Sequence, residues 1–261
     1  GYECDLVKLK SLVKGRDVRF RKLMTILFRS LFLNKNNALK TYGKSYEKTL
    51  VDGTERKFFA FTDEYLKPVE VSWRRLKSLA KEAVACFSGS DQIWNSSTLY
   101  VDPLYYLRFA PKQKRIALSP SFGRNFIADY NKNKMKKCIN DYPYLSVRED
   151  SGVKLIKELT GLEAQHLLDP TLIINSEEWR KNLHIEEKIK NYILAYFLDE
   201  PSSHAKNALK ALKEQLNCKV IALPYKFEDM DYCDEAVAAG PKEFVAVSYT
   251  HLRAHETSQD L

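Results

Sequence analysis

Short apolar segments that end in polar or glycine-containing loops alternate with helical stretches along this chain. Three such segments come first, at residues 83–87, 115–118 and 144–147, and the last leads into a helical stretch that extends through Leu159. Strands that alternate with helices pair in parallel, because each helix carries the chain back to the edge where the strand began. The sequence therefore predicts an α/β fold built on parallel sheets.

A second series of strands and helices begins after a polar helical stretch near residues 177–191. It comprises a strand at 192–197, a helix at 203–216 and a strand at 219–223. Two series of this kind indicate two α/β units, each with its own core. We expect a boundary near Asn175, with an N-terminal domain over residues 1–175 and the beginning of a second domain over residues 176–246.

Polar side chains follow the three strands of the first series. In open parallel sheets, ligands bind beyond the carboxyl ends of the strands, where loop amides and helix N-termini gather. This rule selects five pocket candidates without naming a reaction: Ser90, Asp91, Ser121, Arg148 and Glu149.

The formal net charge of +8 raises the question of a nucleic-acid partner. The basic residues, however, interleave with Asp and Glu along most of the chain. No helix-turn-helix, RNA-binding strand motif or zinc finger accompanies them. We therefore expect no nucleic-acid partner, and a mildly basic surface that suits anionic small substrates.

The five cysteines are widely spaced and none is arranged as Cys-x-x-Cys. This pattern indicates neither a disulfide framework nor a zinc site, so we expect no bound metal and a reducing compartment such as the cytosol. No uninterrupted apolar run reaches the roughly 20 residues that a membrane-spanning helix needs.

Residues 18–32 are typical of a basic amphipathic helix, with Arg19, Arg21, Lys22 and Arg29 set among Phe, Leu, Met and Ile. Such a helix can lie on an anionic membrane surface. It can also pack its apolar face on its own domain, and this is the arrangement we expect.

Several short motifs resemble the polysaccharide pyruvyl transferase family and occur in that family's order. Each motif is weak alone, but their series is fairly specific and covers roughly residues 58–246. The motifs lie at residues 89–95, 106–111, 115–123, 146–149 and 168–171, followed by Glu178-Trp179 and residues 240–244.

The resemblance implies a reaction in which phosphoenolpyruvate and two sugar hydroxyls give a cyclic ketal and phosphate, with no metal or organic cofactor. Such a reaction needs a cation for the donor, an acid for the enol carbon and a base for the attacking hydroxyl. Arg148 fits the first role, because its guanidinium binds carboxylate or phosphate through parallel hydrogen bonds. The alternative is an Arg148 that only pairs with neighbouring carboxylates.

Glu149 and Asp91 are the carboxylates available for proton transfer, and the sequence does not divide the two roles between them. Sugar sites combine amides, hydroxyls and an aromatic face. On that basis the expected acceptor surface comprises Ser90, Gln92, Trp94 and Asn95.

Two members of this set have structural alternatives. Trp94 can instead belong to the core. Ser121, with Gly123, can present a hydroxyl and an amide to an anion, but a small-residue turn after a strand has the same sequence.

The family resemblance also implies two Rossmann-like domains of GT-B type, here incomplete. Gly1-Tyr2-Glu3 resembles the end of the family's first strand–helix unit, and the later Ser-Phe-His-like motif has no counterpart before Ala246. Residues 247–261 resemble a translated sequencing adapter, so we expect a non-native tail, a truncated second domain and a fragment that is inactive alone.

Two other functions fit the same architecture: a nucleotide-sugar-dependent GT-B glycosyltransferase and a non-catalytic sugar-binding fragment. The resemblance implies bacterial exopolysaccharide, capsule or cell-wall polymer synthesis in the cytoplasm, including the inner face of the membrane. The implied partners are phosphoenolpyruvate and a saccharide acceptor that can be lipid-linked, with peripheral membrane contact left open. The oligomeric state is not specified by the sequence.

Overall fold

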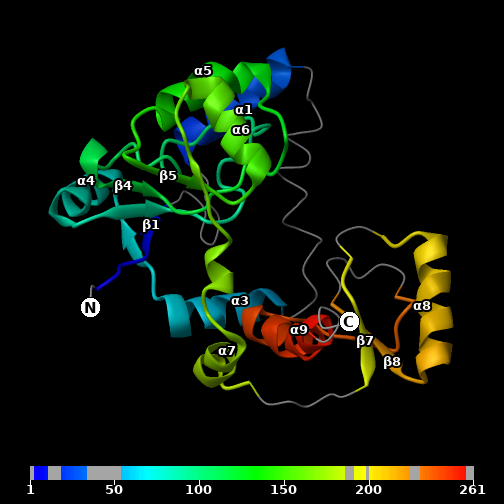
Figure 1. The fold of residues 1–261 in the computed structure, drawn as a ribbon. Coiled ribbons are helices and arrows are strands. Elements are labelled where there is room, and N and C mark those ends of the chain that lie inside the picture. The colour runs from blue at the N-terminus through cyan, green and yellow to red at the C-terminus, as the bar shows by residue number, and fades with distance from the viewer. Residues whose placement is uncertain are drawn as a thin grey trace. The chain divides into compact units, whose positions relative to one another are not determined.

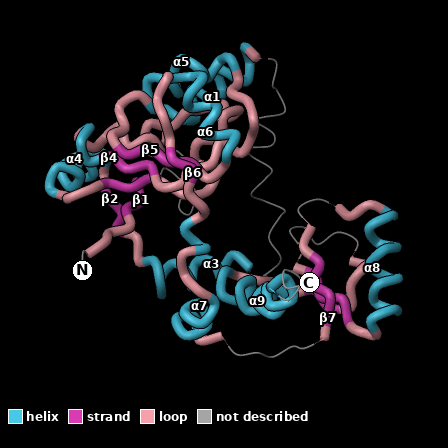
Figure 2. Tube along the Cα trace, in the orientation of Figure 1, coloured by secondary structure: helices cyan, strands magenta, loops and turns pink. Residues whose placement is uncertain are grey.

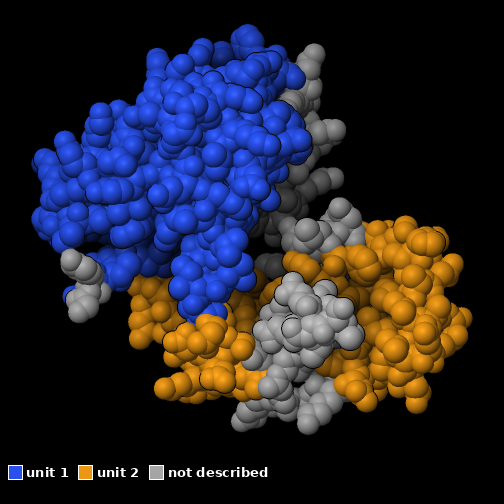
Figure 3. Space-filling model, viewed as in Figure 1, with its two compact units in different colours: residues 1–39, 69–174 blue, residues 40–68, 175–261 orange. Residues whose placement is uncertain are grey.

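The computed structural model describes residues 3–10, 19–33, 54–185, 191–197, 200–223 and 230–256. These residues form two compact units, coloured separately in Figure 3. Unit 1 comprises residues 1–39 and 69–174, and unit 2 comprises residues 40–68 and 175–261. The expected boundary near Asn175 coincides with one junction between the units, whereas residues 40–68, assigned to the N-terminal domain from the sequence, belong to unit 2.

Unit 1 contains a four-stranded parallel sheet of order β3-β4-β5-β6, shown in Figure 2. Its strands are β3 (Cys86–Ser88), β4 (Arg115–Ala117), β5 (Tyr144–Val147) and β6 (Gln165–His166). The three strands predicted from apolar segments are therefore present and pair in parallel, as the strand–helix alternation requires. The α/β fold class is confirmed.

Helices α5 (Asp129–Ile139) and α6 (Asp150–Thr160) supply the crossovers of this sheet. Each buries one stripe, with Met135 and Ile139 on α5 and Ile156 on α6 fully enclosed. Helix α6 ends at Gly161, whose left-handed φ of 80° is the usual helix C-terminal geometry. A short 3₁₀ turn, η2 (Lys112–Lys114), precedes β4.

A second, two-stranded parallel sheet in unit 1 joins β1 (Val7–Leu9) to β2 (Val69–Val71). Helix α4 (Trp73–Glu82) follows β2 directly, and the Ser72 hydroxyl caps it by accepting a hydrogen bond from the Arg75 amide. Leu76 of α4 packs with Leu9 and Val71 in a small core of its own.

Helix α1 (Phe20–Phe32) lies beside α5 in unit 1 (Figure 1), because Arg29 donates a hydrogen bond of 2.8 Å to Asn131 Oδ1. The expectation that its apolar face packs on the domain is wrong. Only Ile26 and Ser30 of this helix are buried, and most of its other apolar side chains are exposed. The inward side instead carries polar contacts, which hold the helix by hydrogen bonds rather than by a broad apolar interface.

Unit 2 has a three-stranded parallel sheet of order β7-β8-β9, with strands β7 (Tyr192–Ala195), β8 (Lys219–Ala222) and β9 (Glu235–Ala236). Its helical elements are α3 (Thr54–Phe61), the π-helical turn η1 (Thr62–Leu66), α7 (Ser176–Leu183), α8 (Ser203–Leu216) and α9 (Pro241–Glu256). The predicted helix at 203–216 is present, and the polar stretch predicted near 177–191 is helical only to Leu183; residues 186–190 lie outside the described part.

Helix α9 runs across residue 246, where the sequence suggested that native structure ends. Val247 is buried in the core of unit 2, and its carbonyl accepts a 2.5 Å hydrogen bond from the Tyr192 hydroxyl. Residue 247 therefore packs in the core of unit 2, while the expectation of a non-native tail over residues 247–261 stays a prediction. Residues 257–261 lie outside the described part.

Within the described residues, every helix is too short or too polar to cross a membrane.

Candidate functional site

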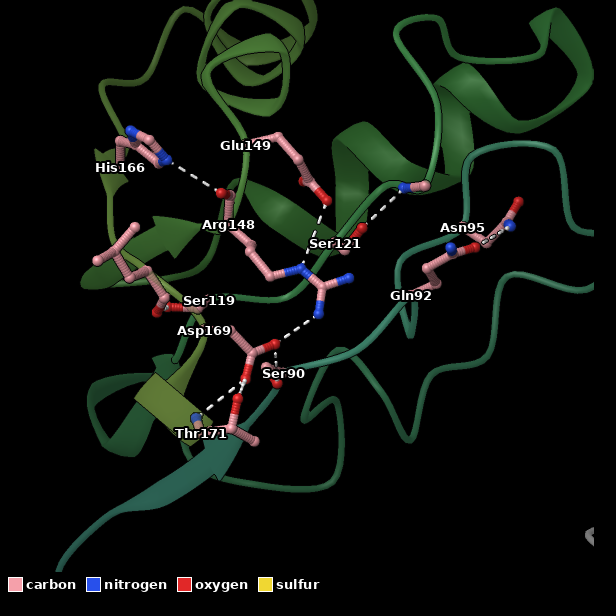
Figure 4. A network of polar contacts seen from close by, with 12 residues as sticks. Ser90, Gln92, Asn95, Ser119, Ser121, Arg148, Glu149, His166, Asp169 and Thr171 are labelled. Atoms are coloured by element: carbon pink, nitrogen blue, oxygen red, sulfur yellow. Dashed lines mark hydrogen bonds and ion pairs between the residues drawn. The ribbon is translucent and has the colours of Figure 1, made fainter. Parts of the chain in front are cut away.

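Polar side chains from three loops meet at the carboxyl ends of the strands of the four-stranded sheet (Figure 4). Ser90 follows β3, Arg148 and Glu149 follow β5, and Asp169 follows β6. Asp169 accepts hydrogen bonds from both Ser90 and Arg148, which ties the three loops together. The structure thus brings together three of the residues selected from the sequence and adds Asp169.

The ion pair between Arg148 and Asp169 is the central contact of this cluster. Arg148 Nη1 lies 2.5 Å from Asp169 Oδ2, and Ser90 Oγ donates to the same oxygen over 3.0 Å. The other carboxylate oxygen, Oδ1, accepts from the Thr171 amide over 3.0 Å and from the Thr171 hydroxyl over 2.8 Å. Asp169 therefore fixes the turn that opens the 3₁₀ helix η3 (Pro170–Leu172) and also orients Arg148.

These contacts shift the pKa values of both partners. Partial burial would raise the pKa of Asp169, but hydrogen bonds from Thr171, Arg148 and Ser90 outweigh it and lower that pKa to about 2. The hydrogen bond to Asp169 raises the pKa of Arg148 above its ordinary value. Both groups are charged throughout the physiological pH range, so the site keeps a fixed ion pair.

Two atoms of the cluster are left for a ligand. Within the described part of the chain, Arg148 Nη2 has no hydrogen-bond partner, while Nε lies 3.7 Å from Glu149 Oε1. Glu149 Oε2 is buried and also lacks a partner there. A buried carboxylate oxygen without a hydrogen-bond donor is costly, so a ligand that donates to Glu149 Oε2 would remove this cost.

The loop after β3 approaches β4 closely at Gly89. A Cβ atom on Gly89 would lie 1.7 Å from the Leu118 carbonyl oxygen, so only glycine fits. Asp91 and Ser119, which follow β3 and β4, have positive φ angles of 21° and 50°. Residues held in such sparsely populated backbone regions cluster at functional sites, and here they lie at the carboxyl edge of the sheet.

Ser121 is buried and forms a turn rather than an open anion site. Its hydroxyl accepts a 2.9 Å hydrogen bond from the Gly123 amide, so the two groups expected to face an anion satisfy each other. Its own amide donates to the Asp91 carbonyl over 2.8 Å. Ser121 therefore shapes the loop that carries Asp91.

Gln92 and Asn95 form a pair of their own, separate in Figure 4 from the Arg148 cluster. Asn95 Nδ2 donates to Gln92 Oε1 over 3.3 Å, and Gln92 is exposed. Asp91 is also exposed. These three side chains can reach a ligand from the loop after β3.

Trp94 does not belong to an acceptor surface. Its side chain is fully buried, stacks on Tyr106 with ring centroids 5.0 Å apart, and donates from Nε1 to the Tyr105 carbonyl over 3.0 Å. Phe122 and Tyr142 meet it edge-on. Burial of its large ring in the core outweighs any surface role, so this prediction is corrected.

Sequence reasoning missed two residues of the network. These residues are Asp169 and His166, and neither was among the pocket candidates selected from the sequence. His166 Nε2 lies 3.0 Å from the Arg148 carbonyl oxygen, and its Nδ1 lies 2.9 Å from Asp150 Oδ1. Asp150 is the first residue of α6. Asp169 lies beside Arg148 because β6 pairs with β5 in parallel, and a prediction of this strand pairing would have been needed to find the contact.

Among the described residues, no three His, Cys, Asp or Glu side chains group so that they could hold a metal ion.

Comparison with known proteins gives one family. No curated protein matches the chain, and no solved structure matches it. The model of the family described as polysaccharide pyruvyl transferase matches residues 31–250, which include the whole Arg148 cluster and most of both units. This match covers far more than half of the chain, and the chain therefore belongs to the polysaccharide pyruvyl transferase family.

Proposed function

We propose that this chain carries the donor site of an enzyme that transfers the pyruvyl group of phosphoenolpyruvate to two hydroxyls of a saccharide. The observation that supports this proposal is Arg148 at the end of β5, oriented by Asp169 and with Nη2 free of partners within the described residues. A guanidinium held in this way binds an incoming carboxylate or phosphate without first having to be ordered.

The proposed reaction needs two proton transfers, which we assign to Glu149 and Asp91. A proton adds to the methylene carbon of the donor, and the first sugar hydroxyl bonds to the adjacent carbon while losing its own proton. The carbon–oxygen bond to phosphate then breaks, the second hydroxyl bonds to the same carbon, and its proton leaves with phosphate. The products are a cyclic ketal with a methyl group and one inorganic phosphate.

We assign the proton for the donor carbon to Glu149. Its Oε1 lies 3.7 Å from Arg148 Nε, so this carboxyl group lies beside the guanidinium that would hold the donor. Its Oε2 is buried and has no partner among the described residues, so this oxygen is available to the donor carbon.

Asp91 is then the base for the attacking hydroxyl, with Gln92 and Asn95 as hydrogen-bonding groups for the sugar. All three lie on the loop after β3, and Asp91 and Gln92 are exposed. Amide groups both donate and accept, as sugar hydroxyls do. Ser90 lies on the same loop and fixes it by donating a hydrogen bond to Asp169.

The setting that we propose follows the family. The two units belong to two Rossmann-like domains of GT-B type, and neither a metal nor an organic cofactor takes part. The product enters an exopolysaccharide, capsule or cell-wall polymer, with an acceptor that can be lipid-linked. The reaction takes place in the cytoplasm or at the inner face of the membrane.

Calorimetric titration of the chain with phosphoenolpyruvate and, separately, with UDP-glucose tests the proposal. We expect phosphoenolpyruvate to bind and Arg148→Ala to weaken binding roughly 10- to 100-fold, since each charge-assisted hydrogen bond contributes about 1.5–3 kcal/mol. The control Arg74→Ala removes an exposed arginine of α4 and leaves binding unchanged. Equal binding by Arg148→Ala, or binding of UDP-glucose in place of phosphoenolpyruvate, would refute it.

A further inference from the structure

Helix α1 is amphipathic but packs with its polar side inward. Arg29 points into unit 1, donating to Asn131 Oδ1 over 2.8 Å and to the Leu99 carbonyl over 3.3 Å, and it stacks over the Tyr130 ring. Ile26 and Ser30 are the buried residues of the helix. The domain therefore holds α1 by a polar anchor and turns its apolar side outward.

The outward side forms a continuous apolar stripe. Phe28, Leu31 and Phe32 expose 61%, 60% and 74% of their surfaces. Residues spaced by three and four positions share one face of a helix, so these side chains align with the other exposed ones. We name this set the α1 stripe: Phe20, Met24, Leu27, Phe28, Leu31 and Phe32. Single exposed apolar residues need no explanation, but a whole helix face indicates a partner.

Basic side chains gather at the start of the same helix. They line a cavity of about 310 Å³ whose walls also include Trp73 and Tyr100. The basic residues at this cavity are Lys10, Arg19, Arg21 and Lys22. Asp102 forms an ion pair with Arg19. No acidic residue occurs in the first turn of α1. This end of the helix therefore attracts anions.

We propose that α1 docks this protein on an anionic lipid membrane, with the α1 stripe in the interfacial region and the basic cavity at the phosphate headgroups. An apolar face combined with a basic end is the pattern of interfacial helices, and it fits a phosphate-covered apolar layer better than a second copy of an equally basic surface. The proposal is independent of the reaction, and its test needs no turnover.

The test measures cosedimentation of the full chain with two kinds of vesicle, phosphatidylcholine alone and an equal mixture of phosphatidylcholine and phosphatidylglycerol. We expect binding to the mixed vesicles that weakens as salt is added, and little binding to phosphatidylcholine. The charge reversal Arg21→Glu/Lys22→Glu lowers partitioning roughly fivefold for each side chain that reaches the lipid. Its control is Arg74→Glu/Lys77→Glu on α4, which leaves partitioning unchanged.

The stripe itself is tested by Leu27→Glu/Leu31→Glu, which lowers partitioning about tenfold or more. The matched control is Leu212→Glu/Leu216→Glu on α8, because the spacing is the same and the exposures of 44% and 59% match those of Leu27 and Leu31, 38% and 60%. Leu27→Gln/Leu31→Gln removes apolar area without adding charge, and a thermal melt establishes that it folds.

Three results overturn the proposal. The first is equal partitioning of the parent and a folded stripe variant, and the second is the absence of vesicle binding or equal binding to both vesicle types. The third is a dimer in sedimentation velocity that Leu27→Gln/Leu31→Gln converts to a monomer, which would assign the α1 stripe to a second copy of the chain.

Discussion

Arg148 and Asp169 form an ion pair of 2.5 Å between the loops that follow two neighbouring parallel strands. The carboxylate accepts hydrogen bonds at both of its oxygens, so it holds the guanidinium in one direction and fixes its own turn at the same time. An arginine oriented by a charged partner differs from a mobile surface arginine, because it has lost its conformational freedom before a ligand arrives.

The lowered pKa of Asp169 predicts a pH-dependent contribution to stability. Its folded-state pKa of about 2 lies below its ordinary value of 3.8, so the charged form stabilises the folded state. That stabilisation is fully present above about pH 4 and is lost as the pH falls through about 2. Asp169→Asn keeps an acceptor for the Thr171 amide but lacks the charge that Arg148 needs.

We therefore expect Asp169→Asn to lower the free energy of unfolding at about pH 7. The difference in this free energy between parent and variant should become smaller towards about pH 3. Urea unfolding of both proteins across this pH range measures the difference. The control is Asp63→Asn, because Asp63 is exposed and forms no ion pair with another described residue. A gap that stays constant down to about pH 3 would show that the Arg148 contact is not formed in solution.

The burial of Trp94 predicts that it supports stability. Trp94→Ala removes a fully buried ring and a hydrogen bond to the Tyr105 carbonyl, so we expect a loss of about 3–5 kcal/mol in the free energy of unfolding. Trp73→Ala serves as control, because Trp73 is 37% exposed and should cost less. Denaturant unfolding measures both losses. A Trp94→Ala protein as stable as the parent would support the alternative that Trp94 belongs to the acceptor surface.

The close approach of Gly89 to β4 predicts a steric effect. In Gly89→Ala the new Cβ would meet the Leu118 carbonyl oxygen, and φ is +152°, so the loop that carries Ser90 and Asp91 must move. We expect a destabilisation of about 2 kcal/mol or more. Gly161→Ala is the matched control, since its φ is +80° but nothing lies within 4 Å, and its cost should be about 1 kcal/mol. Equal thermal shifts for the two variants would contradict the contact.

The strand pattern alone predicts polar side chains at the carboxyl ends of the parallel strands, and the structure has the Arg148 cluster there. Strands predicted at 115–118 and 144–147 were found within one residue of these bounds. Asp169, which follows β6, contacts Arg148 after the neighbouring strand β5, and it also contacts Ser90 after β3 at the other edge of the sheet. What the pattern could not supply was the partner of Arg148, since that depends on which strand lies next to β5.

The sequence also could not predict in which direction two sets of side chains point. The spacing of residues 18–32 predicts an amphipathic helix but does not say which face meets the domain, and that depends on Arg29 finding Asn131 on a distant helix. Trp94 stands among polar residues in the sequence, yet its ring enters a core built by Tyr106, Phe122 and Tyr142. Both outcomes depend on contacts between residues far apart along the chain.

The position of Glu149 beside Arg148 predicts that its negative charge opposes donor binding. Glu149 Oε1 lies 3.7 Å from Arg148 Nε, so an anion bound to the guanidinium lies close to this carboxylate. Glu149→Gln keeps the shape of the side chain but removes the charge, and we expect phosphoenolpyruvate to bind roughly 3- to 10-fold more tightly in calorimetric titration. The control Asp63→Asn removes an exposed charge in unit 2 and leaves binding unchanged. Equal or weaker binding by Glu149→Gln would place the donor away from Glu149 and would remove the assignment of this residue as the acid.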